Sequence, residues 1–214
     1  MPGTLTRDAL GGPPAPPTEG GWGGGGGDSN DGRGSSRGAS FTGLYVLLAA
    51  TTMVFAAFTS AMVVRRGLSN DWVSMHKPSI LWVNTGILLV SSAALELARR
   101  ALRRRNRDGF NVWWTVGSVL GILFLGGQMM AWRQLQHAGV FVATNPSSSF
   151  FYILTGAHAV HLLGGATALC YVDVQALRLR LGPAKRTAID VSALFWHFLD
   201  GLWLYLMVLF YVWG

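Results

Sequence analysis

Two histidines near the middle of a long apolar run are the residues of this chain best placed to do chemistry. His158 and His161 are three positions apart in the stretch 148–165, so on a helix they share one face. Their imidazole rings could bind a metal or a haem, or could meet polar groups of a neighbouring helix. Because polar rings are costly in hydrocarbon, such a pair needs partners.

A second pair, His197 and Asp200, has the same spacing in the last apolar run. A lone aspartate at the centre of a membrane helix costs about 2.5–3.5 kcal/mol on insertion scales, so Asp200 should be protonated or paired with the histidine. Counting about 1.5 Å per residue along antiparallel helices places His158, His161 and Asp200 near the midplane, with His197 about one turn away. We therefore predict that these four side chains form one structural polar cluster.

Three other interpretations of these residues remain open. Three histidines and an aspartate on two helices have the ligand types of a metal site, but no further carboxylate lies at that depth for a dinuclear centre. A bis-histidine haem would pair His158 or His161 with His197, although a two-haem cytochrome needs a fourth ligand at matching depth. Ion or substrate transport is the third interpretation, although no inverted repeat or broken helix is evident.

The elements that carry these residues are membrane helices. Half of the 214 residues are hydrophobic and 13% are charged, whereas about a quarter of a soluble domain is charged. Five apolar runs each reach the roughly 20 residues that a helix needs to cross a bilayer while satisfying its own backbone. They cover residues 41–64, 78–98, 111–132, 148–172 and 190–213. The expected fold class is all-α: a polytopic membrane protein with five transmembrane helices in a bundle.

The basic residues sort by loop and give the expected orientation. Of the 17 Lys and Arg residues, thirteen lie in the N-terminal tail and the second and fourth loops, and four lie on the other side. The positive-inside rule then places the N-terminus in the cytoplasm and Gly214 outside. We expect Arg99, Arg100, Arg103 and Arg104 to contact anionic lipid headgroups. The net charge of +7 could suggest a nucleic-acid partner. Because most of the basic residues lie in loops on one side of the membrane, membrane topology explains them better, and nucleic acid is not an expected partner.

Residues 1–40 form a separate zone of composition. Proline and glycine runs at 13–17 and 23–27 predict a disordered cytoplasmic tail. Four acidic residues balance its three arginines, unlike a mitochondrial transit peptide, and it has no apolar signal-peptide core. These features favour a bacterial protein whose transmembrane domain is 41–214. Cys170 is the single cysteine, which excludes an intrachain disulfide and a thiolate cluster.

Three further polar residues inside the spans are candidates for subunit contact or proton-related roles. Glu96 is followed by Arg99 and Arg100 at i+3 and i+4, so we expect a same-face ion pair, with a proton antenna or an intersubunit salt bridge as alternatives. Asn84 and Gln128 should both lie in the outer half of the bilayer. We predict that they form an interhelical amide pair worth roughly 0.6–2 kcal/mol, with substrate binding as the alternative.

Two long motifs resemble a known family. The stretch 149–165, SFFYILTGAHAVHLLGG, resembles the strongest motif of subunit III of the haem-copper oxidases. The stretch 194–203, LFWHFLDGLW, together with the terminal YVWG, resembles the last helix of that family. Weaker similarities occur in the first three spans, and the resemblance covers about residues 41–214.

The resemblance implies a non-catalytic subunit of a proton-pumping terminal oxidase of the aerobic respiratory chain, in a bacterial inner membrane. Its partners would be oxidase subunits I and II and membrane phospholipids. Haem and copper would lie in the partner subunits, with no cofactor, metal or catalytic residue in this chain. The matched residues His158, His161, His197 and Asp200 would be structural, and the chain would support the stability and proton uptake of subunit I.

The chain departs from the family pattern in two places. The mitochondrial-type members have seven helices, whereas this chain resembles the shorter bacterial form, so the lipid cleft of the longer form does not carry over directly. Many members also have a carboxylate at the position of Thr51, which puts a proton-buffering role there in doubt. Cytochrome c is the expected electron donor, with a quinol-oxidase or nitric-oxide-reductase-associated subunit as the alternative. Outside the family, the alternative is an independent membrane carrier or a haem-binding electron-transfer protein.

Overall fold

The computed structural model describes residues 31–68, 79–139, 146–178 and 183–213. Within them the chain forms five α-helices and no strand, which confirms the predicted all-α class. The helices are α1 (Asp31–Leu68), α2 (Ile80–Arg103), α3 (Arg107–His137), α4 (Pro146–Leu177) and α5 (Pro183–Trp213). All five are long and apolar enough to cross a membrane.

Each helix is longer than the apolar run that predicted it. The largest difference is in α1, which begins at Asp31 rather than at residue 41. Apolar composition marks only the hydrocarbon-crossing part of a helix, and polar turns can continue into the interfacial layers. The predicted tail at 1–40 otherwise lies outside the described residues.

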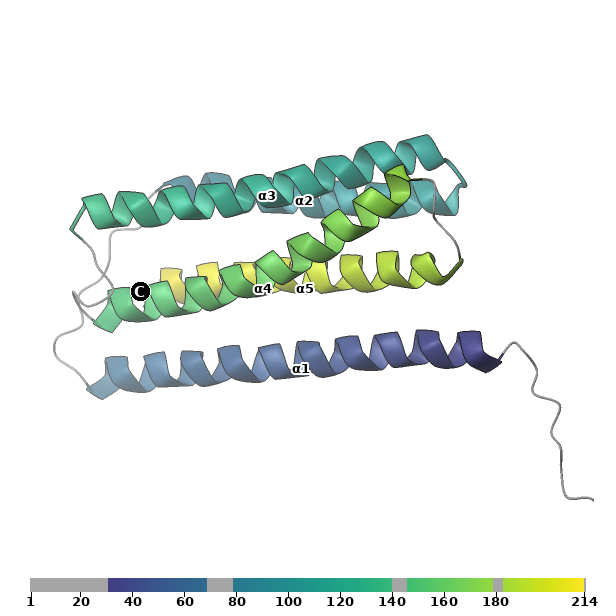
Figure 1. Cartoon of the computed structure of the whole chain (residues 1–214). Coiled ribbons are helices and arrows are strands. Elements are labelled where there is room, and N and C mark those ends of the chain that lie inside the picture. Colours follow the sequence, from purple (N-terminus) through teal and green to yellow (C-terminus); the bar gives the residue numbers. More distant parts are fainter. Residues whose placement is uncertain (1–30, 69–78, 140–145, 179–182, 214) are drawn as a thin grey trace, which may run out of the picture.

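Successive helices run antiparallel, so their ends gather at two opposite ends of the bundle (Figure 1). We call the end where α1, α3 and α5 begin the basic end. The cations at this end include Arg103, Arg104, Arg105, Arg107, Arg178 and Arg186, whereas Arg65, Arg66 and Arg133 lie at the opposite end. The charge asymmetry that was expected between loops is therefore an asymmetry between the two ends of the bundle.

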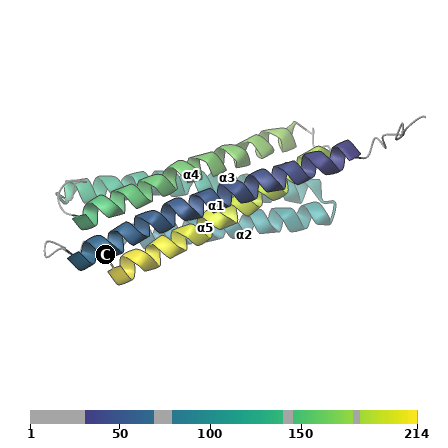
Figure 2. The same cartoon turned by 90° about the horizontal axis from the view of Figure 1, so that it is seen from below.

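Helix α5 is the centre of the arrangement. Figure 1 shows α2 and α3 on one side, α1 on the other, and α4 and α5 between them. Helix α5 contacts α1, α2 and α4, whereas α1 packs on α4 and α5 alone within the described part of the chain. Figure 2 shows α1 lying across these two helices. Polar residues on α5 can therefore meet partners on several neighbours.

The α2–α3 connection is a tight turn at the basic end. Arg105 adopts a left-handed φ of 59°, and Asn106 caps the next helix by accepting a hydrogen bond from the Gly109 backbone nitrogen at 2.9 Å. A capping side chain satisfies one of the backbone donors that a helix start leaves free. This short connection holds α2 and α3 side by side along their length.

Trp196 of α5 fixes how the central helices approach one another. Its ring is fully buried between a glycine on α3 and a glycine on α4. A Cβ atom on Gly121 would come within 2.5 Å of the ring, and one on Gly165 would come within 3.3 Å. Small residues let membrane helices pack closely. Here they provide a slot that sets the rotation of α5 against α3 and α4.

Candidate functional site

His197 and Asp200 lie on one side of α5 and face α2. The Nδ1 atom of His197 is 2.5 Å from Ser92 Oγ and 3.9 Å from Asp200 Oδ2. Asp200 is 4% exposed, and its carboxyl oxygens have no hydrogen-bond partner in the described part of the chain. A buried carboxyl group needs compensation by a partner. His197 is the titratable group that the structure places beside it, so the predicted pairing of these two residues is present.

His158 is packed among aromatic rings at the meeting of α3, α4 and α5. Its ring centroid lies 5.1 Å from that of Trp203, with the two planes inclined at 32°. Phe124 meets it edge-on at 6.4 Å. The imidazole is 1% exposed, and neither ring nitrogen has a hydrogen-bond partner among the described residues. Aromatic packing therefore holds this ring in place.

His161 faces α1. Its Nδ1 atom lies 2.7 Å from the carbonyl oxygen of Ala157, one turn earlier on α4, so this nitrogen is the donor. Its ring meets Phe55 of α1 at 5.8 Å in an edge-to-face arrangement. His161 is thus a contact between α1 and α4, which are otherwise joined by few residues.

The predicted cluster of four is therefore divided. The Ser92–His197–Asp200 group lies between α2 and α5, whereas His158 and His161 contact aromatic residues in two other places. Residues three apart on a helix differ by about 60° around its axis, which is enough to reach different neighbours in a tight bundle. Across the described ranges, no three His, Cys, Asp or Glu side chains converge in a group that could hold a metal ion.

A second polar group lies nearer the basic end. Arg99 and Arg100 contact Glu96 at 3.2 and 3.3 Å, which confirms the ion pairs predicted from their spacing. Arg99 also reaches Asp190 of α5 at 3.4 Å. The Arg99 side chain is only 22% exposed, whereas that of Arg100 is 65% exposed. Arg99 therefore links α2 to α5, and its contact with lipid headgroups stays a prediction.

The predicted Asn84–Gln128 amide pair is wrong. The Nδ2 atom of Asn84 donates to the carbonyl oxygen of Phe124 on α3 at 3.1 Å. Gln128 is 2% exposed, and both polar atoms of its amide lack a hydrogen-bond partner among the described residues. Depth placed the two residues at a similar level, but Asn84 lies against Gly127, whose missing Cβ leaves room for it. Asn84 therefore packs against Gly127, the residue before Gln128, and does not bond to Gln128.

The remaining candidates lie in different settings. Thr51 is buried on α1, and its hydroxyl has no hydrogen-bond partner in the part of the chain that the structure describes. Arg103 and Arg104 are exposed at the basic end, where headgroup contact stays a prediction. Two pairs that the sequence reasoning did not name also join helices. Thr115 donates to Asp173 at 2.7 Å between α3 and α4, and Ser91 donates to the Gly117 carbonyl at 2.8 Å between α2 and α3.

Ser92 and Asp190 could have been found from the sequence. Ser92 lies on α2 at the depth of His197 on α5, and Asp190 lies on α5 at the depth of Arg99. The same counting along antiparallel helices that compared the histidines would have matched both pairs. Trp203 and Phe124 gave no such signal, because aromatic residues are common throughout these spans.

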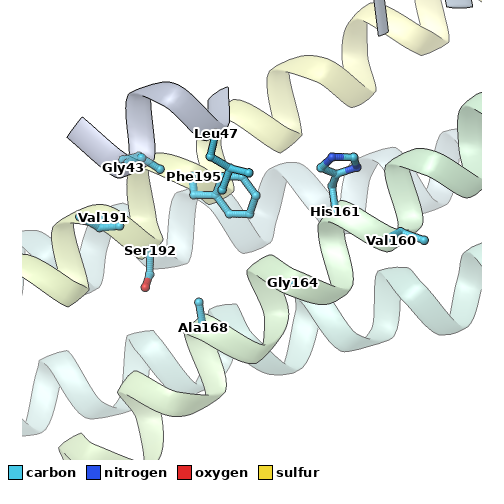
Figure 3. Close-up of a pocket in the computed structure, with 10 residues that line it drawn as sticks. Gly43, Leu47, Val160, His161, Gly164, Ala168, Val191, Ser192 and Phe195 are labelled. Atoms are coloured by element: carbon cyan, nitrogen blue, oxygen red, sulfur yellow. The ribbon is translucent and has the colours of Figure 1, made fainter. Parts of the chain in front are cut away.

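An apolar cavity of about 460 Å³ lies between α1, α4 and α5. Gly43 and Leu47 line it from α1, Gly164 lines it from α4, and Phe195 lines it from α5 (Figure 3). In Figure 3 the hydroxyl group of Ser192 points toward Ala168, and His161 lies at one end of the cavity. The glycines on α1 and α4 open this space, and its lining suits a hydrocarbon chain better than a polar ligand.

These features define a class of protein. Five apolar helices carry buried polar groups, some of which join helix to helix, and large apolar side chains such as Met53, Trp82 and Val160 point outward. Such a surface suits hydrocarbon or other membrane subunits. The molecule is therefore a multi-pass helical membrane protein.

Comparison with known proteins identifies the family. The profile described as "Cytochrome c oxidase subunit III" matches residues 39–214. A cytochrome c oxidase subunit 3 from Corynebacterium diphtheriae is 31% identical over 176 residues, covering 79% of this chain and 85% of that relative. One from Thermostichus vulcanus is 28% identical over 177 residues, covering 79% and 85%. A quinol oxidase subunit 3 from Bacillus subtilis is 25% identical over 175 residues, covering 80% and 86%.

The chain belongs to the cytochrome c oxidase subunit III family, and it is a subunit III of a haem-copper oxidase. The matched range covers all five membrane-crossing segments apart from Gly38, the first residue of the first segment. The resemblance that was carried by the stretches 149–165 and 194–203 is thereby confirmed.

Proposed function

We propose that this chain is a non-catalytic subunit of a proton-pumping terminal oxidase, in which partner subunits I and II hold the haem and copper. The observation that carries this proposal is the engagement of its intramembrane histidines in helix contacts. A bis-histidine haem needs two imidazoles that face each other from different helices. The ring of His158 instead packs on Trp203, and that of His197 meets Ser92. These contacts favour structural roles for His158 and His197 over haem ligation.

The role of the chain is to stabilise subunit I and support its proton uptake. Its buried polar contacts give the bundle one defined arrangement: Ser92 with His197, Arg99 with Asp190, and the aromatic packing around His158. Polar contacts between helices in a low-dielectric interior favour one packing over others. Contacts that hold the helices in one arrangement support a role in which this chain packs against its neighbouring subunits.

Purification of the tagged chain in mild detergent tests this proposal. We expect the complex to show haem absorption and to contain copper, together with larger partner chains. The chain separated from those partners should retain its helices and show neither haem nor copper. Haem or copper retained by the isolated chain would contradict the proposal, and so would purification without any oxidase subunit.

Cytochrome c is the proposed electron donor. Relatives with similar coverage are named both as cytochrome c oxidase and as quinol oxidase subunits, which keeps quinol as the second candidate. Oxygen uptake by the purified complex separates the two, because the working donor is consumed with the oxygen. Uptake with reduced cytochrome c and none with a quinol supports the first assignment, and the reverse result replaces it.

The proposed location is a bacterial inner membrane with the basic end in the cytoplasm. The charge asymmetry between the two ends and the bacterial source of the named relatives support this placement. Alkaline phosphatase fused after Gly214 should be active, because it folds only outside the cytoplasm. The same enzyme fused in the α2–α3 turn, after Arg105, should be inactive. Exchanged activities would reverse the orientation.

A phospholipid is the proposed occupant of the cavity between α1, α4 and α5. Its lining is almost entirely aliphatic and aromatic, and it opens among membrane-crossing helices. Gly164→Leu should fill the cavity and lower the amount of tightly bound lipid that mass spectrometry detects in the complex. Gly126→Leu is the matched control, since Gly126 also has open space around it but does not line the cavity. Equal lipid in both variants would contradict this assignment.

A further inference from the structure

Two buried polar side chains in the core between α3 and α4 lack a hydrogen-bond partner. Gln128 is 2% exposed and His158 is 1% exposed. The two amide atoms of Gln128 and the two ring nitrogens of His158 have no partner in the described part of the chain. Buried polar atoms are rarely left unpaired, because each lost hydrogen bond carries the full cost of desolvation. Each of these side chains therefore requires a partner.

The register of α3 against α4 brings Gln128 close to His158. One turn before Gln128, Phe124 meets the His158 ring at 6.4 Å. One turn after it, Trp132 Nε1 donates to Thr155 Oγ1 at 3.2 Å. Because residues four apart lie on one side of a helix, Gln128 lies between these two contacts, opposite the turn of α4 that joins Thr155 to His158.

The directions of the side chains bring their ends together. Helical side chains lean toward the N-terminus of their own helix. Helices α3 and α4 are antiparallel (Figure 1). Gln128 therefore leans back toward the level of Phe124, whereas His158 leans toward the level of Thr155. The amide and the imidazole converge on one depth.

We propose that Gln128 and His158 bind one water molecule between them. A neutral imidazole has one donor and one acceptor nitrogen, and an amide has donors and an acceptor, so both match a water that donates and accepts. Buried waters typically make about three hydrogen bonds to groups of this kind. Phe124 and Trp203 pack against the His158 ring and bound the site on that side.

Asn84 is the rival partner, because its Oδ1 atom also lacks a hydrogen bond among the described residues. Its position argues against it. Asn84 is packed against Gly127 and bonded to the Phe124 carbonyl. Successive residues on a helix point about 100° apart. Gln128 therefore projects from α3 in a different direction from Gly127, the residue against which Asn84 packs.

A density map of the complete complex at a resolution that shows water tests the proposal directly. We expect a peak within hydrogen-bond distance of the Gln128 amide and of one His158 ring nitrogen. The peak should be absent from the map of a Gln128→Met, His158→Phe double variant. A direct bond from Gln128 to His158 or to Asn84, or an empty site in the wild-type map, would overturn the proposal.

A double-mutant cycle tests the coupling independently. Gln128→Met keeps the side-chain length, and His158→Phe keeps the ring contacts with Trp203. Each single change should lower the midpoint for heat-induced release of this chain from the complex by roughly 2–8 °C, because it leaves the other partner unpaired. The midpoint of the double variant should be no lower than that of the less stable single variant. If the double variant lowers the midpoint by the sum of the two single effects, the proposal is overturned.

Gln134→Met is the matched control for this cycle. It makes the same chemical change on α3, but Gln134 is exposed. Its effect should be small, and it should add to that of His158→Phe without coupling. If His158→Phe fails to assemble, the wild-type map decides the question by itself, because it requires no variant.

Discussion

Trp203 on α5 is joined to Thr85 on α2 by a buried hydrogen bond of 3.0 Å from the indole Nε1 to the threonine Oγ1. The same hydroxyl donates to the Leu81 carbonyl at 2.8 Å. Both polar groups are thereby satisfied in the core. Since the Trp203 ring also packs on Phe124 and His158, this residue connects four of the five helices.

Thr85→Val should destabilise the bundle. Valine has nearly the same shape as threonine but cannot accept the indole hydrogen bond, which leaves a buried N–H group unpaired. We expect a loss of about 1–3 kcal/mol, measured as earlier heat-induced release of the chain from the complex. Thr52→Val is the control, because Thr52 is exposed and its hydroxyl bonds to the Leu48 carbonyl of its own helix. Equal effects of the two changes would refute the assigned role of Thr85.

Gly121→Ala should be far more damaging than Gly126→Ala on the same helix. A Cβ atom on Gly121 would come within 2.5 Å of the buried Trp196 ring, whereas one on Gly126 meets nothing within 4 Å. Overpacking a rigid core costs about 1–3 kcal/mol. The yield of assembled complex and the midpoint of its thermal dissociation measure the difference. Gly126→Ala should match the wild type or exceed it slightly, because alanine favours the helix.

The sequence was sufficient to predict the helices and the contacts within one helix. Hydropathy located five spans, because a bilayer requires long apolar runs. The Glu96 ion pairs also followed from spacing alone, since residues three and four apart always share a helix face. These features depend on the geometry of a single helix and need no knowledge of its neighbours.

Contacts between helices were predicted less well, because depth does not fix rotation. Asn84 and Gln128 were expected to pair because of their similar level, but the rotation of α3 turns Gly127 toward Asn84 instead. His158 and His161 were expected to face the same partner helix, but His158 packs on Trp203 and His161 on Phe55. The rotation depends on close packing of the kind seen at Trp196, and no periodic pattern in the sequence reports it.

Asp200→Ala should loosen assembly while leaving the oxidase haem spectrum unaltered. The substitution removes the carboxyl group beside His197 and leaves a cavity in a site that is 4% exposed. We expect less of this chain per complex after a detergent wash, with normal absorption bands from the subunit I that remains. Asp200→Asn keeps the volume and should be milder. A shifted haem spectrum with normal assembly would show that Asp200 acts on the redox centre instead.

Arg99→Gln should weaken the bundle more than Arg100→Gln, although both arginines contact Glu96. Arg99 also bridges to Asp190 at 3.4 Å, so its loss breaks the link from α2 to Asp190 of α5, whereas Glu96 keeps its contact with Arg100. Arg100 is largely exposed, and exposed pairs contribute only about 0–1 kcal/mol. We expect thermal dissociation of the complex to occur earlier for the Arg99 variant, by an amount that corresponds to about 1 kcal/mol more. Raising the salt concentration should shrink the effect of Arg100→Gln first, because salt screens exposed charges more strongly than partly buried ones. Equal losses with equal salt dependence would mean that the bridge from α2 to α5 does not contribute.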